Sequence, residues 1–133
     1  MATVPSSTVF YSDFDFRFIG HPHTGRLIMR KNADSITQAI KLLIMTDQFE
    51  RPFRPFLGSA VRQSLFDQFS GMTIDNIEES IIMAINNIET RATDVEVFTA
   101  VDPDSNQLDI KIVYRPVNAT NAVEVNFTLE RLR

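Results

Sequence analysis

The chain has 133 residues, a length that fits one domain with a hydrophobic core of its own. Its 13 basic and 17 acidic residues give a net charge of −4, and no basic run occurs, which argues against a nucleic-acid partner. The absence of cysteine excludes disulfides and thiolate chemistry, and without a secretory signal or an apolar run of about 20 residues we expect a cytosolic protein with no membrane partner.

Residues 1–33 are predicted to form an arm or hairpin ahead of the main domain. Phe14, Phe16 and Phe18 alternate with charged residues, which is the period of a half-buried strand. A turn rich in glycine, proline and histidine follows, and residues 26–30 are predicted to form a second short strand. This hairpin either packs on the core of its own domain or needs a neighbouring subunit to become ordered.

A first helix is predicted to begin near Asp34, whose carboxylate can accept hydrogen bonds from the amides of the first turn. Ile36, Ile40 and Leu43 form one apolar stripe, and the last turn is apolar nearly all round. A helix end of this kind is buried on every side. It must therefore be covered either by other elements of the domain or by another subunit.

A proline-rich loop follows and is predicted to be rigid and extended, because its two prolines fix φ and interrupt helices. Arg51 in this loop can pair with local carbonyls and carboxylates, which favours a structural role inside the domain. Ser59 is predicted to cap a second helix whose apolar face carries Val61, Leu65 and Phe69. The predicted structural motif of the loop comprises Glu50, Arg51, Pro52, Phe53, Pro55 and Gly58.

The third helix has the clearest pattern, with isoleucines recurring at spacings of three and four. Thr73 is its predicted N-cap, and acidic residues in its first turns suit the helix dipole. Met83 lies opposite the stripe, either as an ordinary exposed side chain or as part of a second contact surface. The stripe consists of Ile74, Ile77, Ile81, Ile85 and Ile88.

Three strands are predicted in the last third of the chain, over residues 95–101, 108–114 and 123–129. Apolar and polar side chains alternate in each, and turn-forming residues separate them. Strands joined this closely form an antiparallel meander with one apolar face, which the helices would cover. The predicted fold class is therefore α+β, with about three α-helices packed on an antiparallel β-meander in one globular unit over residues 34–133.

Six short motifs occur in a characteristic order along the chain. They are Tyr11–Phe16, His21–Gly25, Leu42–Thr46, Glu50–Phe53 with Pro55 and Gly58, Leu65–Phe66, and Glu89–Arg91. In this order and spacing the sequence resembles the gene-25-like baseplate wedge proteins of contractile-tailed phages, which are related to a small wedge component of type VI secretion baseplates. The chain departs from that family where Arg26 and Phe56 replace acidic residues and Thr90 replaces proline, changes that concern local contacts and leave the expected fold intact.

The resemblance implies a structural subunit of a hetero-oligomeric wedge, without a cofactor, assembled in the host cytoplasm into the tail baseplate of a virion. It implies other baseplate wedge proteins and the tail sheath protein as partners, with the tail tube as a further candidate. It also implies that the strands resemble those of the sheath protein and act as sheath initiator. The last strand leaves a free edge, which suits strand addition. The predicted partner-binding residues are Met83, Glu89, Arg91, Val123, Val125 and Phe127, of which Glu89 and Arg91 either meet a neighbour or pair with each other.

Two other functions compete with this assembly role. Proteins of this family have carried a lysozyme label, and a peptidoglycan hydrolase needs two carboxylates around one glycosidic bond. Glu78, Glu79 and Glu89 share a helix, with the first two on different faces. Asp13 and Asp15 share a strand, and neither set comes with an aromatic sugar platform, since the chain lacks tryptophan. We therefore predict no enzymatic activity and no catalytic residue; a cytosolic regulator of the anti-adaptor type, with a similar fold, is the other alternative.

His21 and His23 flank a proline in the predicted turn. A metal site would need a third ligand, for which Asp13 or Asp15 is near enough in sequence. Two histidines in a turn are more often plain turn residues, so we predict no metal.

Overall fold

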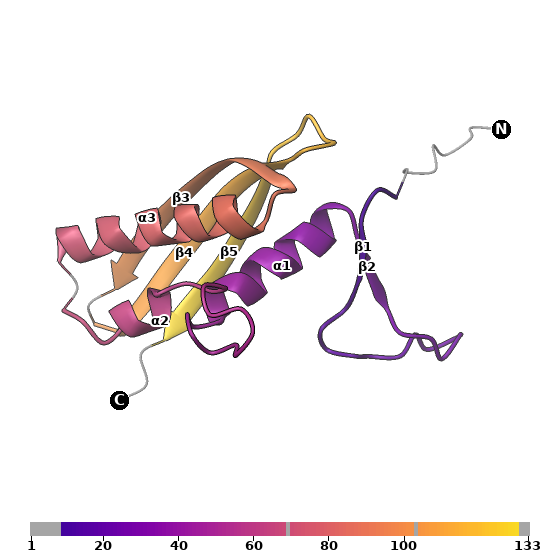
Figure 1. Ribbon diagram of the computed structural model, residues 1–133, viewed down its shortest axis with the longest axis horizontal. Helices are drawn as coiled ribbons and strands as arrows, with labels where there is room; N and C mark the ends of the chain where they lie inside the picture. Colours follow the sequence, from indigo (N-terminus) through magenta and orange to yellow (C-terminus); the bar gives the residue numbers. More distant parts are fainter. Residues whose placement is uncertain (1–8, 69, 103, 131–133) are drawn as a thin grey trace.

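The computed structural model describes residues 9–68, 70–102 and 104–130. Within these ranges the chain forms three helices, a three-stranded antiparallel sheet and a separate two-stranded hairpin (Figure 1). No helix in them is long and apolar enough to cross a bilayer. In chain order the elements are β1 (Ser12–Phe14), β2 (Met29–Lys31), α1 (Ala33–Met45), α2 (Val61–Ser64), α3 (Gly71–Ile88), β3 (Ala92–Asp102), β4 (Gln107–Pro116) and β5 (Val123–Glu130).

The three-stranded sheet has the predicted meander topology, with strand order β3-β4-β5. Ile112 of β4 lies opposite Val97 of β3 and Val125 of β5, and all three side chains are buried on one face. In Figure 1, α3 runs along this sheet and α1 lies beside it. The predicted α+β class is confirmed.

The core lies between the helices and this face of the sheet. Its fully buried side chains come mostly from the predicted stripes of α1 and α3 and from β4. Tyr114 has no exposed surface, and its hydroxyl is hydrogen-bonded to Thr37 Oγ1 at 2.8 Å and to Ala33 O at 2.9 Å. These two bonds tie the sheet to the first turns of α1.

Helix α3 starts earlier than predicted. Ser70 is its N-cap, and the Ser70 hydroxyl accepts a hydrogen bond from Thr73 N at 3.2 Å. The prediction that Thr73 caps the helix was wrong, because Ser70 offers an equally suitable oxygen three residues earlier and the first turn can form despite Gly71. The isoleucine stripe is buried along its middle and becomes 36% exposed at Ile88.

Helix α1 also has a different cap from the one predicted. Asn32 occupies the N-cap position with φ 47°, and its Oδ1 accepts from Phe10 N at 2.9 Å and Tyr11 N at 3.3 Å. Asp34 falls inside the first turn, so the prediction that it is the cap was wrong. The chain entering the hairpin and the chain leaving it are thus joined through one side chain.

Ser59 does not cap α2, contrary to prediction. It is completely buried, and its hydroxyl donates to Ile44 O at 2.8 Å at the end of α1. The Ile44 carbonyl lies at the end of α1, where carbonyl groups have no partner within the helix, so it accepts the Ser59 hydroxyl in place of the expected cap bond at α2. Helix α2 is only four residues long; of its predicted apolar face Val61 and Leu65 are buried, and Phe69 lies outside the described residues.

The proline-rich loop is folded into two successive turns, so the prediction of an extended loop was wrong. Arg54 N donates to Arg51 O at 3.2 Å, and Leu57 N donates to Arg54 O at 3.1 Å. Each turn has a proline at its second position, where the fixed φ of proline favours a turn. The exposed Arg51 side chain forms no ion pair with any described residue, so its expected pairing is not found.

The last turn of α1 is only partly covered by the domain. Ile44 is fully buried, whereas Leu42 and Met45 are 41% and 55% exposed. The expectation that this helix end is buried on all sides is therefore not met within the chain. Coverage of Leu42 and Met45 by another subunit stays a prediction.

Candidate protein interaction surfaces

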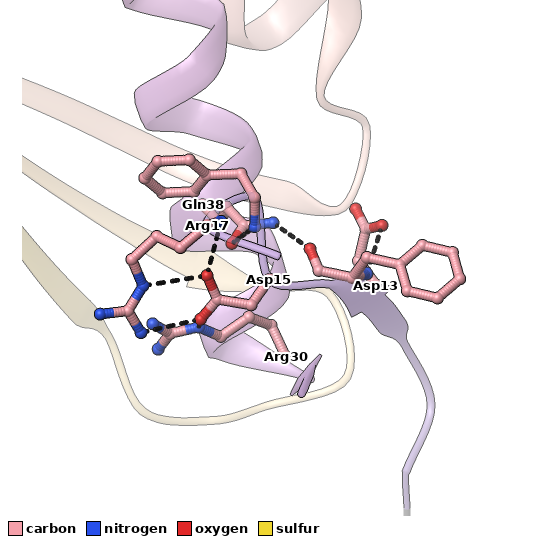
Figure 2. A network of polar contacts seen from close by, with 7 residues as sticks. Asp13, Asp15, Arg17, Arg30 and Gln38 are labelled. Carbon is pink, nitrogen blue, oxygen red and sulfur yellow. Dashed lines mark hydrogen bonds and ion pairs between the residues drawn. The ribbon is translucent and has the colours of Figure 1, made fainter. Parts of the chain in front are cut away.

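A carboxylate lies at the centre of the N-terminal hairpin. Asp15 is 1% exposed and is clamped by two arginines (Figure 2). Arg17 donates from Nε to Asp15 Oδ1 at 3.1 Å and from Nη2 to Oδ2 at 2.9 Å, and Arg30 Nε donates to Oδ2 at 2.8 Å. The hydrogen bonds from Arg17, assisted by Arg30, hold the pKa of Asp15 far below its usual range.

Gln38 anchors the hairpin to helix α1. Its Nε2 donates to Phe14 O at 2.7 Å, and its Oε1 accepts from Phe16 N at 3.2 Å, as Figure 2 shows. Gln38 is buried beside the apolar stripe of α1. Gln38 lies off that stripe, two residues from Ile36, so no local pattern marks it as buried, and its role depends on the hairpin backbone that it contacts.

The hairpin buries the polar Asp15 and leaves its phenylalanines exposed. Strand β1 ends at Phe14, and Phe18 N donates to Asp15 O at 2.9 Å in a turn that puts Phe18 at φ 52°. Phe14 and Phe16 are 53% exposed and Phe18 is 69% exposed. The prediction of a strand half-buried through its phenylalanines was therefore wrong, since the hydrogen-bonded Asp15 occupies the buried side.

Glu89 and Arg91 form an internal ion pair. Arg91 Nε donates to Glu89 Oε1 at 2.6 Å and Arg91 Nη2 donates to Oε2 at 2.7 Å, a two-point contact that raises the pKa of Arg91. The same guanidinium lies 5.4 Å from the centre of the Tyr11 ring and 3.5 Å from Ser35 Oγ. The pair thus joins the end of α3 to the base of the hairpin, and its use by a neighbouring subunit stays a prediction.

A shallow groove runs between α3 and the proline-rich loop. Met83 and Ile88 line it from the helix, and Phe56 lines it from the loop. Met83 is 55% exposed, as its position opposite the stripe predicted, and Phe53 is 97% exposed at the loop tip. The loop keeps its shape through the bond from Phe49 N to Pro55 O at 2.7 Å. A contact role for Met83 stays a prediction, and Phe53 and Phe56 belong to the same surface.

The two outer edges of the sheet differ. The edge formed by β3 carries an irregularity between Thr93 and Glu96, where Asp94 has φ 50°. Farther along, Glu78 from α3 accepts from Thr99 N and from Thr99 Oγ1, each at 2.8 Å. Bulges and charged side chains of this kind protect an edge from pairing with another strand. In the sequence Glu78 stood out as a candidate catalytic carboxylate, and no local pattern indicates its role at the sheet edge.

The edge formed by β5 lacks such protection, since among the described residues only β4 pairs with it. Thr99 N bonds to Glu78, so Thr99 and its partner Ile110 are a pair without mutual hydrogen bonds. Ile110 therefore points its backbone groups toward Phe127 on β5. Because backbone groups alternate in direction along a strand, the amides of Asn126 and Thr128 point away from β4, toward the unpaired side of β5.

The β5 side chains predicted to bind a partner face the core. Val125 is 3% exposed, and Val123 and Phe127 are partly buried against the core cluster. Any contact at this edge would use the backbone groups between them, and direct contact by the three side chains stays a prediction.

Several of the residues weighed for catalysis or metal binding have other partners. Glu78 accepts hydrogen bonds from Thr99, and Glu89 pairs with Arg91. Hydrogen bonds lower the pKa of the carboxyl groups of Asp15, Asp102 and Glu124. A glycosidase acid needs the opposite shift. His21 and His23 lie in the predicted turn, with ring centres 5.8 Å apart, and no three metal-binding side chains gather within the described part of the chain.

Comparison with known proteins places this chain among tail proteins. Residues 30–122 match the family model described as baseplate wedge protein gp25, whereas no curated protein matches the sequence. A candidate tail lysozyme from Geobacter sulfurreducens is similar in structure, with TM-score 0.61, 21% identity, and coverage of 74% of this chain and 90% of that chain.

Two baseplates contain chains of similar structure. A chain of the anti-feeding prophage baseplate has TM-score 0.62 and 19% identity, covering 89% of this chain and 83% of that one. A chain of the type VI secretion system baseplate complex has TM-score 0.56 and 8% identity, covering 73% and 93%. At these identities the structural similarity shows the fold alone.

Proposed function

This chain belongs to the family of baseplate wedge protein gp25, a structural component of contractile-tail baseplates, and from that premise we propose that its β5 edge starts the tail sheath by accepting a strand from the sheath protein. The chain would occupy the tail baseplate of a virion after assembly in the host cytoplasm. Other wedge proteins would hold it there, and the tail tube is a further candidate neighbour.

The asymmetry of the sheet is the observation that carries this proposal. One edge is blocked by Glu78 and a backbone irregularity, while the other presents the free backbone groups of an eight-residue strand. Backbone pairing at such an edge is a common way to add a strand from another chain. Because only one edge is open, strand addition would proceed from β5 in one direction.

Proline at position 126 tests the proposal. Asn126→Pro removes an amide that points away from β4, so it should leave the meander folded while blocking an added strand. Asn126→Ala keeps the amide and is the matched control, since among the described residues the Asn126 side chain bonds only to Glu124 Oε1. We expect the proline variant to enter wedge complexes but to fail in sheath attachment, seen by electron microscopy of reconstituted baseplates. Equal sheath attachment by both variants contradicts strand addition at β5.

Peptidoglycan hydrolysis is the competing function. The structural similarity to the candidate tail lysozyme from Geobacter sulfurreducens is the observation that favours it. Clearing of a peptidoglycan gel by the purified protein, lost in a Glu79→Gln variant, would support hydrolysis. We expect no clearing.

A further inference from the structure

The N-terminal hairpin exposes an unusual amount of apolar side chain for its size. Phe14 lies directly opposite Met29, so both side chains belong to one face. Exposed apolar side chains in this number on one short hairpin are typical of a contact site, since monomers in water rarely leave so many uncovered. We name this set the arm surface: Phe10, Phe14, Phe16, Phe18, Ile19, Leu27 and Met29, which are between 39% and 69% exposed.

The arm surface is held in place before any partner arrives. Two three-residue strands have marginal stability on their own. Here the buried Asp15 clamp closes the hairpin, Gln38 ties it to α1, and Asn32 joins its two ends. Figure 1 shows the hairpin projecting past the start of α1, away from the sheet. A surface fixed in advance loses little conformational entropy on binding.

The charge around the arm surface is positive, although the chain as a whole is negative. Residues 9–31 contain four basic and two acidic side chains, a net charge of +2 against −4 for the whole sequence. Two guanidiniums share the single carboxylate of Asp15. Arg26 and Lys31 are exposed and form no ion pair with any described residue.

These observations point to a partner whose contact surface is both apolar and acidic. Positive charge on the same hairpin as exposed apolar side chains favours a partner with negative charge, which fixes orientation and speeds association. The match to the wedge family begins at residue 30, and the residues of the arm surface all precede it, so this surface lies outside the matched range. Nucleic acid fits less well, because the remainder of the chain would repel phosphates.

We propose that the arm surface binds an acidic, apolar segment of a neighbouring baseplate wedge subunit and so holds this chain in the wedge. This inference rests on the proposed function in that it takes the partner from the baseplate. It differs in the surface used, because sheath addition would use β5 at a separate place on the chain.

The experiment measures binding of the full chain to the other purified wedge proteins of the same tail. Phe16→Ser removes an aromatic group that is 53% exposed, and Phe98→Ser, also 53% exposed but on the sheet, is the matched control. We expect Phe16→Ser to weaken binding about tenfold or more, as loss of an aromatic anchor does, with no change for Phe98→Ser.

A second pair of variants tests the acidic character of the partner. The double variant Arg26→Glu with Lys31→Glu reverses the free charges of the arm, and Lys111→Glu with Arg115→Glu makes the same charge change at two exposed positions of strand β4. We expect the arm variant to bind at least about tenfold more weakly, and the control variant to bind as the unaltered chain does. Added salt should weaken binding by the unaltered chain but not by the arm variant.

The outcomes separate this inference from the proposed function. An unaltered chain that binds no wedge protein contradicts the proposed function itself. If the unaltered chain binds and the arm variants bind equally well, the arm inference alone is wrong. Three results would overturn the choice of partner. They are dimerisation of the purified chain in sedimentation, binding to anionic lipid vesicles, and binding to single-stranded DNA, if any of these depends on the arm and replaces binding to wedge proteins.

Discussion

At the scale of single residues, Asp15 determines which side of the hairpin faces inward. The alternation of phenylalanine with charged residues was a sound sign of an extended segment, but it does not state which set is buried. Two arginines and a backbone amide satisfy the Asp15 carboxylate, so its burial costs little and the phenylalanines remain outside. Polarity alone could not predict this, because Arg30 is distant in sequence.

The lowered pKa of Asp15 leads to a pH prediction for the hairpin. A carboxyl whose pKa is lowered by folding contributes its full stabilisation above the unfolded value of about 3.9 and loses it as the pH falls toward the folded value. We expect the hairpin to stay closed from pH 7 to about pH 5 and to open only in strongly acidic solution. The amide of Arg17, which donates to Asp15 Oδ1 at 3.0 Å, reports this by NMR.

Asp15→Asn should loosen the hairpin at every pH, and Asp13→Asn is its control. Asp13 is exposed, and within the described part of the chain it accepts a side-chain hydrogen bond only from the neighbouring Phe14 N. An opening midpoint between pH 5 and 7 in the unaltered chain would contradict the clamp.

Gly58 is a second residue whose identity follows from its position. It has φ 125°, and a Cβ there would overlap the carbonyl oxygen of Thr46. We expect Gly58→Ala to lower the free energy of unfolding by about 1–3 kcal/mol, measured by urea denaturation. Gly71→Ala is the matched control, because a Cβ at Gly71 meets nothing within 4 Å and alanine favours a helix. Equal unfolding midpoints for the two variants would contradict this account.

At the scale of elements, periodicity predicted the helices and strands well, whereas capping did not. The buried stripes of α1 and α3 and the alternation in all three sheet strands are confirmed. Thr73, Ser59 and Asp34 failed as caps for different reasons, since Ser70 caps α3 locally, while α1 and α2 have no side-chain hydrogen bond at their N-caps. Ser59, for example, bonds to a carbonyl of another helix.

The protected edge of β3 gives a prediction for the sheet as an element. Glu78→Ala should free the amide of Thr99 and let two chains pair through β3, so sedimentation should show more self-association than for the unaltered chain. Glu79→Ala, one residue along and exposed, is the control. A monomeric Glu78→Ala variant would show that the irregularity at Asp94 is enough to protect this edge.

At the scale of the whole molecule, the chain consists of a cored domain and a hairpin held by polar contacts. The domain buries apolar side chains from all three helices and the sheet. The hairpin instead depends on the Asp15 clamp, Gln38 and the contacts of Tyr11, which accepts from Asn118 Nδ2 at 3.1 Å. The predicted boundary near residue 33 stays a prediction.

Hydrogen exchange should reveal two levels of stability in the intact molecule. Amides of β4, the central strand, should exchange only with global unfolding, while those of β1 and β2 should exchange through local opening at lower free energy. Mass spectrometry of exchanged peptides measures both. Equal protection of the hairpin and β4 would show that they open together. Binding to wedge proteins should raise protection in the hairpin, and sheath addition should raise it in β5.

The sequence by itself determined the α+β class, the order of helices and strands and the family, because these depend on local periodicity and on the order of short motifs. Only the tertiary structure decided which caps are used, which face of the hairpin is buried and which edge of the sheet is open. The buried face of the hairpin and the open edge of the sheet depend on side chains far apart in the chain, such as Arg30 at Asp15 and Glu78 at Thr99, and Ser59 fails as a cap because it bonds to the distant Ile44 carbonyl. Pairing between distant residues is set by packing of the whole domain, and no local pattern contains it.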